Sequence, residues 1–143
     1  MLDAMTKHEQ FNGVLSLVSN SPYAATGYGT QAGYMVDRFV RHGLRTAVQS
    51  NYGLEGRFDK IRTPHGEAMH YPKGFKPYSD DVIQLWHDDW KKQNPGLKSA
   101  LMTLYDVWVY DQLKFDDPIF AYVPIDHVTM PPLVHKFLMR DNV

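Results

Sequence analysis

The stretch LSLVSNSPYAATGYGTQAGYMVDRFVRHGLRTAV, residues 15–48, decides the fold of this 143-residue chain. An almost continuous apolar run over residues 13–19 is typical of a strand buried on both faces. After a loop rich in Ser, Pro, Ala and Gly, apolar residues recur at helical spacing from Gly29 onward, and residues 46–50 form a second strand. This strand–helix–strand order predicts a right-handed crossover between two parallel strands.

Two residues are expected to mark the ends of this helix. Thr30 is a candidate N-cap, because a threonine side chain can accept a hydrogen bond from a free N–H of the first turn. Gly43 stands where a left-handed C-terminal cap is expected.

The rest of the chain predicts more sheet beside this unit. A hairpin is expected around the turn Pro64-His65-Gly66, and a helix capped by Ser79 is expected to end before Asn94-Pro95-Gly96. Side chains expected to face inward are Val82, Ile83, Trp86 and Trp90, and Trp108 is also expected in the core. The remaining predicted elements are strands over residues 100–105 and 119–123 and a short helix opened by Pro131-Pro132.

This order of elements predicts an α/β fold: a three-layer Rossmann-like domain with a mostly parallel sheet and an inserted β-hairpin. Residues 1–143 are expected to form a single domain. No further strand is predicted after the last helix. The domain is therefore expected to be truncated before its last elements.

The composition excludes several classes of protein. With 43% hydrophobic residues, 22% charged residues and a formal net charge of −1, the chain lacks the basic stripe of a dedicated nucleic-acid binder. No apolar run approaches the ~20 residues of a membrane span, and the polar first twelve residues do not resemble a secretory signal, so a cytoplasmic location is expected. The absence of cysteine excludes disulfides and thiolate zinc sites.

The strongest candidate site is the loop formed by Gly27, Tyr28, Gly29 and Thr30. Free N–H groups and the helix dipole favour anions at the start of a helix, and glycine lets a ligand approach the backbone. No Walker sequence follows, and the dinucleotide pattern GxGxxG has Ala32 in place of its third glycine, a substitution that the pattern tolerates. The alternative is a tight strand-to-helix turn without a ligand.

Acidic residues and a histidine follow two later strands. Asp126 and His127 come after residues 119–123, and His127 has the chemistry of a hydrogen-bond donor or a base near neutral pH. Asp106 and Asp111 follow the preceding strand and are candidates for binding sugar hydroxyls. The alternatives are a His–Asp hydrogen bond that stiffens the loop and aspartates that cap turns. The seven histidines show no metal-ligand spacing, so no metal is expected.

At the glycine loop and at the segments YDVWVYDQ and YVPIDHVTMPP, the chain resembles the N-terminal half of a GT-B glycosyltransferase of the retaining, nucleotide-sugar-dependent, group-one type. The resemblance runs from about residue 15 to the end and includes His42-Gly43 before the second strand. Enzymes of this kind are common in actinobacteria and occur in some of their phages. If this chain is encoded by a phage, its expected location is the cytoplasm of the host cell.

The resemblance implies roles for these residues. Gly27 and Gly29 match the loop near the donor diphosphate or the acceptor, and His127 matches a histidine that contacts the transferred sugar, with Asp126 beside it. It implies a nucleotide-sugar co-substrate, an unknown acceptor and no metal or other cofactor. The donor is held mainly by a C-terminal domain with an E-x7-E motif, so a separate domain or chain is an expected partner and this chain alone is expected to transfer little or no sugar. The alternative is a stand-alone binding or assembly module that self-associates without catalysis.

Overall fold

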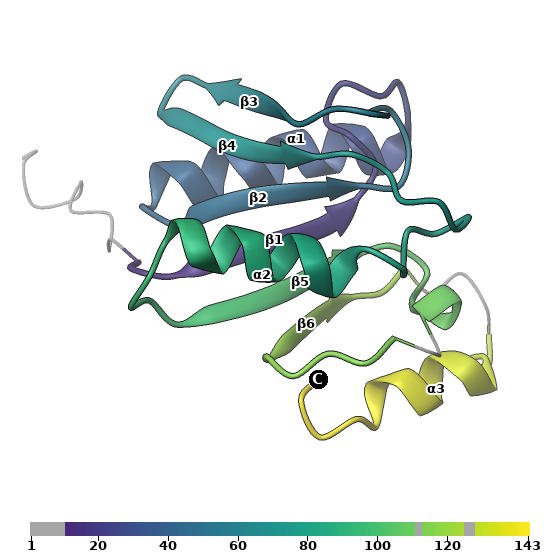
Figure 1. Ribbon diagram of the computed structural model, residues 1–143. Helices are drawn as coiled ribbons and strands as arrows, with labels where there is room; N and C mark the ends of the chain where they lie inside the picture. Colours follow the sequence, from purple (N-terminus) through teal and green to yellow (C-terminus); the bar gives the residue numbers. More distant parts are fainter. Residues whose placement is uncertain (1–10, 111–112, 125–127) are drawn as a thin grey trace, which may run out of the picture.

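The computed structural model describes residues 11–110, 113–124 and 128–143, and shows a sheet with helices on both faces (Figure 1). In chain order the elements are β1 (Val14–Ser19), α1 (Gly27–Arg41), β2 (Arg45–Ser50), β3 (Asp59–Thr63), β4 (Gly66–Tyr71), α2 (Ile83–Gln93), β5 (Ser99–Leu104), the 3-10 helix η2 (Val107–Tyr110), β6 (Ile119–Tyr122) and α3 (Pro132–Leu138).

The six strands form one sheet in the order β3-β4-β2-β1-β5-β6. Strand β1 lies at the centre and pairs in parallel with both β2 and β5, and the parallel pairing continues to β4 on one side and β6 on the other. Among the described strands only β3 is antiparallel, and it forms a hairpin with β4 in which Thr63 pairs with Gly66. The α/β Rossmann-like prediction with a mostly parallel sheet is therefore confirmed.

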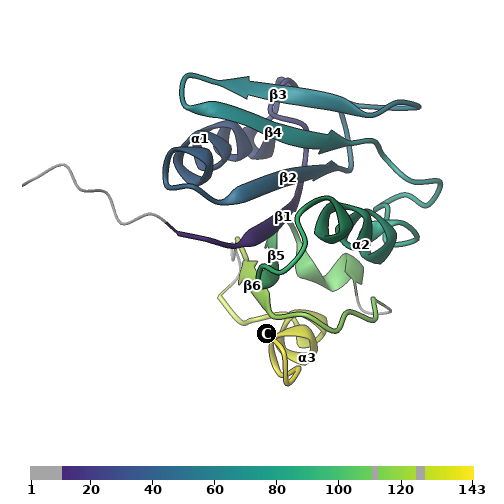
Figure 2. The same cartoon turned by 60° about the vertical axis from the view of Figure 1, so that its left-hand side comes forward.

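Each face of the sheet carries its own core. Leu17 and Val18 are neighbours on β1 and point to opposite faces, as successive residues of a strand must. Leu17 packs with α1 and with buried residues of β2, β3 and β4. Val18 packs with α2, η2 and α3 on the other face, and the two layers are separated in Figure 2.

Helix α1 begins two residues earlier than the sequence pattern predicts. Its N-cap is Thr26, whose side-chain oxygen accepts a hydrogen bond from the Gly29 N–H at 3.0 Å. The prediction that Thr30 is the cap is wrong, because Thr26 already satisfies the third N–H of the helix and Thr30 lies within the first turn. Gly43 follows the helix with a φ of +88°, so the predicted left-handed position is confirmed.

Helix α2 also differs from its prediction. It begins at Ile83 with no side-chain cap, and Ser79 instead has a φ of +58° and accepts a hydrogen bond from the Gly74 N–H at 3.0 Å. Its buried residues are Ile83 and His87, one turn apart, whereas Trp86 and Trp90 are only half-buried. Trp108 is 43% exposed, so its prediction as a core residue is wrong.

Candidate functional site

The carboxyl ends of β1 and β5 are adjacent at the centre of the sheet. The chain leaves β1 toward α1 on one face and leaves β5 toward η2 on the other (Figures 1 and 2). In open α/β sheets, ligands bind in the crevice where the strand order reverses in this way. The candidate site is therefore the region between the carboxyl ends of β1 and β5, which we call the central crevice.

The loop from β1 into α1 is held from both sides. Asn20 donates its side-chain amide to the Thr26 hydroxyl at 3.1 Å, and the Ser21 N–H donates to the Tyr52 carbonyl at 2.7 Å. Gly53 has a φ of +98° and lies so close to Ser21 that a β-carbon there would stand 2.7 Å from the Ser21 side chain. The loops after β1 and β2 thus form one packed unit.

The two glycines of the predicted site differ in their surroundings. A β-carbon on Gly29 would stand 2.7 Å from the Ser21 carbonyl oxygen, and the Gly29 N–H already donates to Thr26. A β-carbon on Gly27 would meet no atom within 4 Å. Gly29 is therefore explained by the packing of its own loop, whereas nothing in the described structure requires glycine at residue 27.

Aromatic rings cluster between the loop after β1 and the segment after β5, where Tyr110 is fully buried. The Tyr28 ring lies 5.1 Å from the Tyr105 ring, and Tyr105 lies 6.2 Å from Tyr78 and 6.4 Å from Tyr110. We call these four residues the tyrosine cluster. Burial raises the pKa of Tyr105, and Tyr78 and Asp106 raise it further. Burial likewise raises the pKa of Tyr110, whose hydroxyl accepts a hydrogen bond from Asn51 at 2.8 Å.

Asp106 is half-buried and lies two residues after the end of β5. Its carbonyl accepts the Val109 N–H at 3.2 Å, so it also begins η2. The structure thus places Gly27, Tyr28, Gly29 and Thr30 on one side of the central crevice and Asp106 on the other. Asp111, Asp126 and His127 lie outside the described residues; β6, which precedes the last two, ends at Tyr122 on the same edge of the sheet.

Several buried polar atoms near the carboxyl edge of the sheet have no hydrogen-bond partner within the described chain. They belong to residues at or next to the ends of β1, β2 and β5 and are Ser19 Oγ, Asn20 Oδ1, Asn51 Oδ1 and Thr103 Oγ1. Leaving such a group unpaired costs about 1–3 kcal/mol, so water or a ligand is expected to satisfy it. The sequence pattern gave no sign of this set, because its members come from three segments that are tens of residues apart.

A second polar network has the residue types of a catalytic triad but lies in the core. The Ser16 hydroxyl lies 2.7 Å from His87 Nδ1, and His87 Nε2 lies 2.8 Å from Asp117. Burial lowers the pKa of His87 although Asp117 opposes the effect, so the neutral ring donates to Asp117 and accepts from Ser16. Because Ser16 and His87 are fully buried, a substrate cannot reach the hydroxyl, and the network ties α2 to the sheet.

Asp117 completes this network. It also accepts hydrogen bonds from Lys91 at 2.8 Å and Ser99 at 2.6 Å. Its partial burial favours the neutral acid, but the hydrogen bonds from Lys91, Ser99 and His87 outweigh that effect and lower the pKa to about 2.

Within residues 11–110, 113–124 and 128–143, no group of three or more His, Asp or Glu side chains is placed to hold a metal ion. No helix in the same part of the chain is long and apolar enough to cross a membrane.

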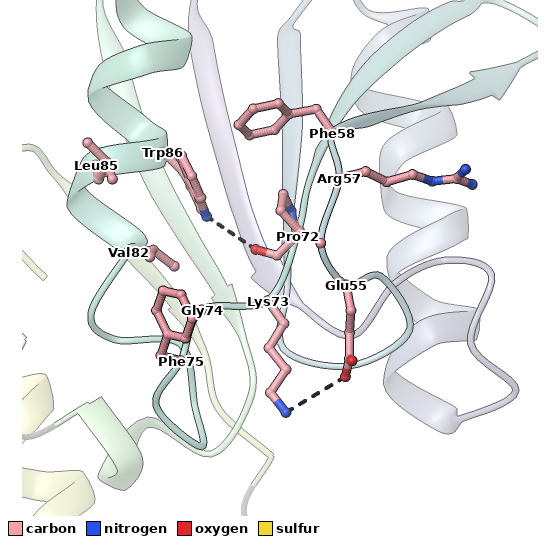
Figure 3. Close-up of a pocket in the computed structure, with 11 residues that line it drawn as sticks. Glu55, Arg57, Phe58, Pro72, Lys73, Gly74, Phe75, Val82, Leu85 and Trp86 are labelled. Carbon is pink, nitrogen blue, oxygen red and sulfur yellow. Dashed lines mark hydrogen bonds and ion pairs between the residues drawn. The ribbon is translucent and has the colours of Figure 1, made fainter.

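The structure also shows a pocket that the sequence analysis missed (Figure 3). It has a volume of about 630 Å³ and is formed by the loop after β2, the loop after β4 and the start of α2. Its apolar lining residues are Phe58, Pro72, Phe75, Val82, Leu85 and Trp86. The signal available in the sequence was the presence of Phe58 and Phe75 in segments otherwise rich in Gly, Lys and Arg.

No protein-family model, curated protein or solved structure matches this chain. The fold defines its class as an α/β protein with a Rossmann-like, mostly parallel sheet whose strand order reverses between β1 and β5.

Proposed function

We propose that this chain is the N-terminal, acceptor-side domain of a GT-B glycosyltransferase that moves a sugar from a nucleotide-sugar donor. One observation carries the proposal. The glycine loop and Asp106, predicted separately as site residues, come after adjacent parallel strands, and Tyr28 of the loop contacts Tyr105, the residue before Asp106. The resemblance of the sequence to the retaining, group-one enzymes points to the same edge of the sheet.

The division of roles follows from the chemistry of each group. A diphosphate would lie at the start of α1, where the helix dipole favours negative charge and Gly27 leaves space for close approach. The Gly29 N–H already donates a hydrogen bond to Thr26. The backbone contact with the diphosphate is therefore expected from the residues before Gly29, which are Gly27 and Tyr28. Asp106 would accept a hydrogen bond from a sugar hydroxyl, and His127 would contact the transferred sugar. Hydrogen-bond donors placed where negative charge develops on the leaving diphosphate would lower the activation barrier of sugar transfer.

Titration of the isotopically labelled chain with UDP, GDP and pyrophosphate, followed by amide NMR, tests the proposal. Amide signals of Gly27 and Tyr28 are expected to shift, and Gly27→Ala is expected to weaken binding at least fivefold because its β-carbon occupies the approach. Gly33→Ala is the matched control, since its β-carbon would have no neighbour closer than 3.8 Å. The absence of any shift with all three probes would count against a diphosphate site.

A second candidate is a non-catalytic module that self-associates. The observation favouring it is an apolar groove where α1 does not cover β5 and β6, lined by Val14, Leu15, Phe39, Leu44, Met102 and Phe120 among others. Phe120 is 61% exposed there. This candidate predicts a dimer in light scattering that Phe120→Ser converts to a monomer, and a wild-type monomer at high concentration would contradict it.

A further inference from the structure

The pocket of Figure 3 exposes aromatic side chains that are held in fixed positions. The indole N–H of Trp86 donates to the Pro72 carbonyl at 3.2 Å, and its ring stacks on Tyr71 at 5.4 Å with an angle of 17°. Phe58 lies edge-on to both rings, 5.2 Å from Trp86 and 5.6 Å from Tyr71. These contacts give one side of the pocket a rigid aromatic surface.

The opposite side of the pocket is formed by the loop that carries Phe75. The backbone of this loop is held by hydrogen bonds, although the Phe75 side chain is exposed. Phe75 is fully exposed, yet its N–H donates to Asp81 at 3.0 Å and the N–H of the preceding Gly74 donates to Ser79. Gly74 leaves room for Asp81, because a β-carbon there would collide with the Asp81 carboxylate and lie 2.9 Å from the Val82 side chain.

The backbone of Ser79 adopts a strained conformation where this loop closes. Its φ of +58° lies in the left-handed region, which costs a residue other than glycine of the order of 1 kcal/mol. Such strain concentrates at functional positions, and here the strained loop presents a phenyl ring to water. The backbone is thus held so that the exposed Phe75 side chain is available for contact with a ligand.

The charges around the pocket compensate one another. Lys73 lies 3.9 Å from Glu55, and Arg57 lies 3.5 Å from Asp59, so each cation at the mouth has a carboxylate partner. A charged ligand would therefore find no uncompensated opposite charge. The volume of about 630 Å³ falls in the range of small-molecule sites.

We propose that this pocket binds an uncharged, planar apolar ring system, and that this ring system is the aglycone of the acceptor, an assignment that rests on the proposed function. The loop after β2 connects the two places: Tyr52 and Gly53 pack on the loop of the central crevice, and residues 55–58 line the pocket. The Lys73 N–H donates to the Leu54 carbonyl at 2.9 Å, which joins this loop to the one after β4. In the proposal, an acceptor with its ring in the pocket extends a hydroxyl along this loop toward the central crevice.

Titration of the labelled chain with 2-naphthol tests the ligand class, with methyl α-glucopyranoside as the comparison probe. The indole N–H signal of Trp86 is expected to shift with 2-naphthol and not with the glucoside. Phe75→Gln is expected to weaken 2-naphthol binding at least fivefold, and because Phe75 is fully exposed the variant is expected to fold normally. Phe120→Gln removes an exposed phenyl ring from β6 and is expected to bind like the wild type.

The outcomes separate the two proposals. No Trp86 shift with 2-naphthol, a shift with the glucoside alone, or equal binding by Phe75→Gln would overturn the pocket assignment. The nucleotide titration is read at the Gly27 and Tyr28 amides instead. No shift of these amides together with retained 2-naphthol binding would count against the diphosphate site of the proposed function and leave the apolar site standing. The reverse result would remove the aglycone site and leave the diphosphate site.

Discussion

Gly27 and Gly29 are equivalent in the sequence pattern but have different physical roles. The space beside residue 29 is filled by carbonyl oxygens of its own loop, so only a hydrogen atom fits there. The space beside residue 27 is open. Packing therefore explains the glycine at residue 29, and it leaves space beside Gly27 that the proposed ligand could use.

Replacement of each glycine by alanine separates these roles. Gly29→Ala is expected to lower the free energy of unfolding by about 2 kcal/mol, because a methyl group forced against backbone must displace the loop. Gly27→Ala is expected to change it by less than about 0.5 kcal/mol. Urea denaturation followed by circular dichroism measures both. Equal losses in the two variants would contradict the packing explanation for Gly29.

At the scale of elements, α2 is attached to the sheet by polar contacts in addition to apolar burial. His87 takes the inward position one turn after Ile83 and reaches Ser16 on β1. Lys91, one further turn along, reaches the same carboxylate as His87. Asp117, which precedes β6, therefore links α2 to Ser99 of β5, and through His87 the same network reaches Ser16 of β1.

Asp117→Asn tests this attachment. The neutral amide weakens the charge-assisted hydrogen bonds from Lys91, Ser99 and His87, so we expect the free energy of unfolding to fall by about 2 kcal/mol. The neighbouring Asp116 is exposed, and Asp116→Asn is the matched control with an expected change below about 0.5 kcal/mol. Similar urea midpoints for Asp117→Asn and the wild type would show that the network adds no stability.

At the scale of the whole molecule, two buried histidines make stability depend on pH. Burial lowers the pKa of His70 from 6.5 to about 4, with Asp59 partly opposing the shift, and His70 bonds to Ser50 at 2.6 Å. Burial also lowers the pKa of His87. Both rings are therefore neutral in the folded state over a range where the unfolded chain takes up protons.

The free energy of unfolding is expected to fall as the pH drops from 6.5 toward 4, because the unfolded state gains protons that the folded state excludes. His70 alone contributes up to about 1.4 kcal/mol per pH unit in that window. His70→Gln is expected to reduce the slope, whereas His65→Gln at the exposed hairpin turn should keep it. Urea denaturation at several pH values measures this, and a flat wild-type profile would be inconsistent with neutral buried histidines. Below pH 3.8 protonation of Asp117 removes further stability.

The features that the sequence by itself determined are those set by neighbouring residues. Apolar runs gave β1, β5 and β6, helical spacing gave the apolar face of α1, Gly43 supplied the positive φ after it, and Pro132 opened α3. Each depends on backbone sterics or on periodicity within about a dozen residues, so it is visible without the rest of the chain.

Only the tertiary structure decided which groups meet. The choice of Thr26 over Thr30 as the cap depends on how the loop after β1 folds back, and the burial of His87 instead of Trp86 depends on Ser16 lying opposite. The contact of Tyr28 with Tyr105 and the pocket between residues 55–58 and α2 depend on the strand order of the sheet. The physical reason is that these contacts join residues tens of positions apart, where burial and shape, which no local pattern encodes, select the partners.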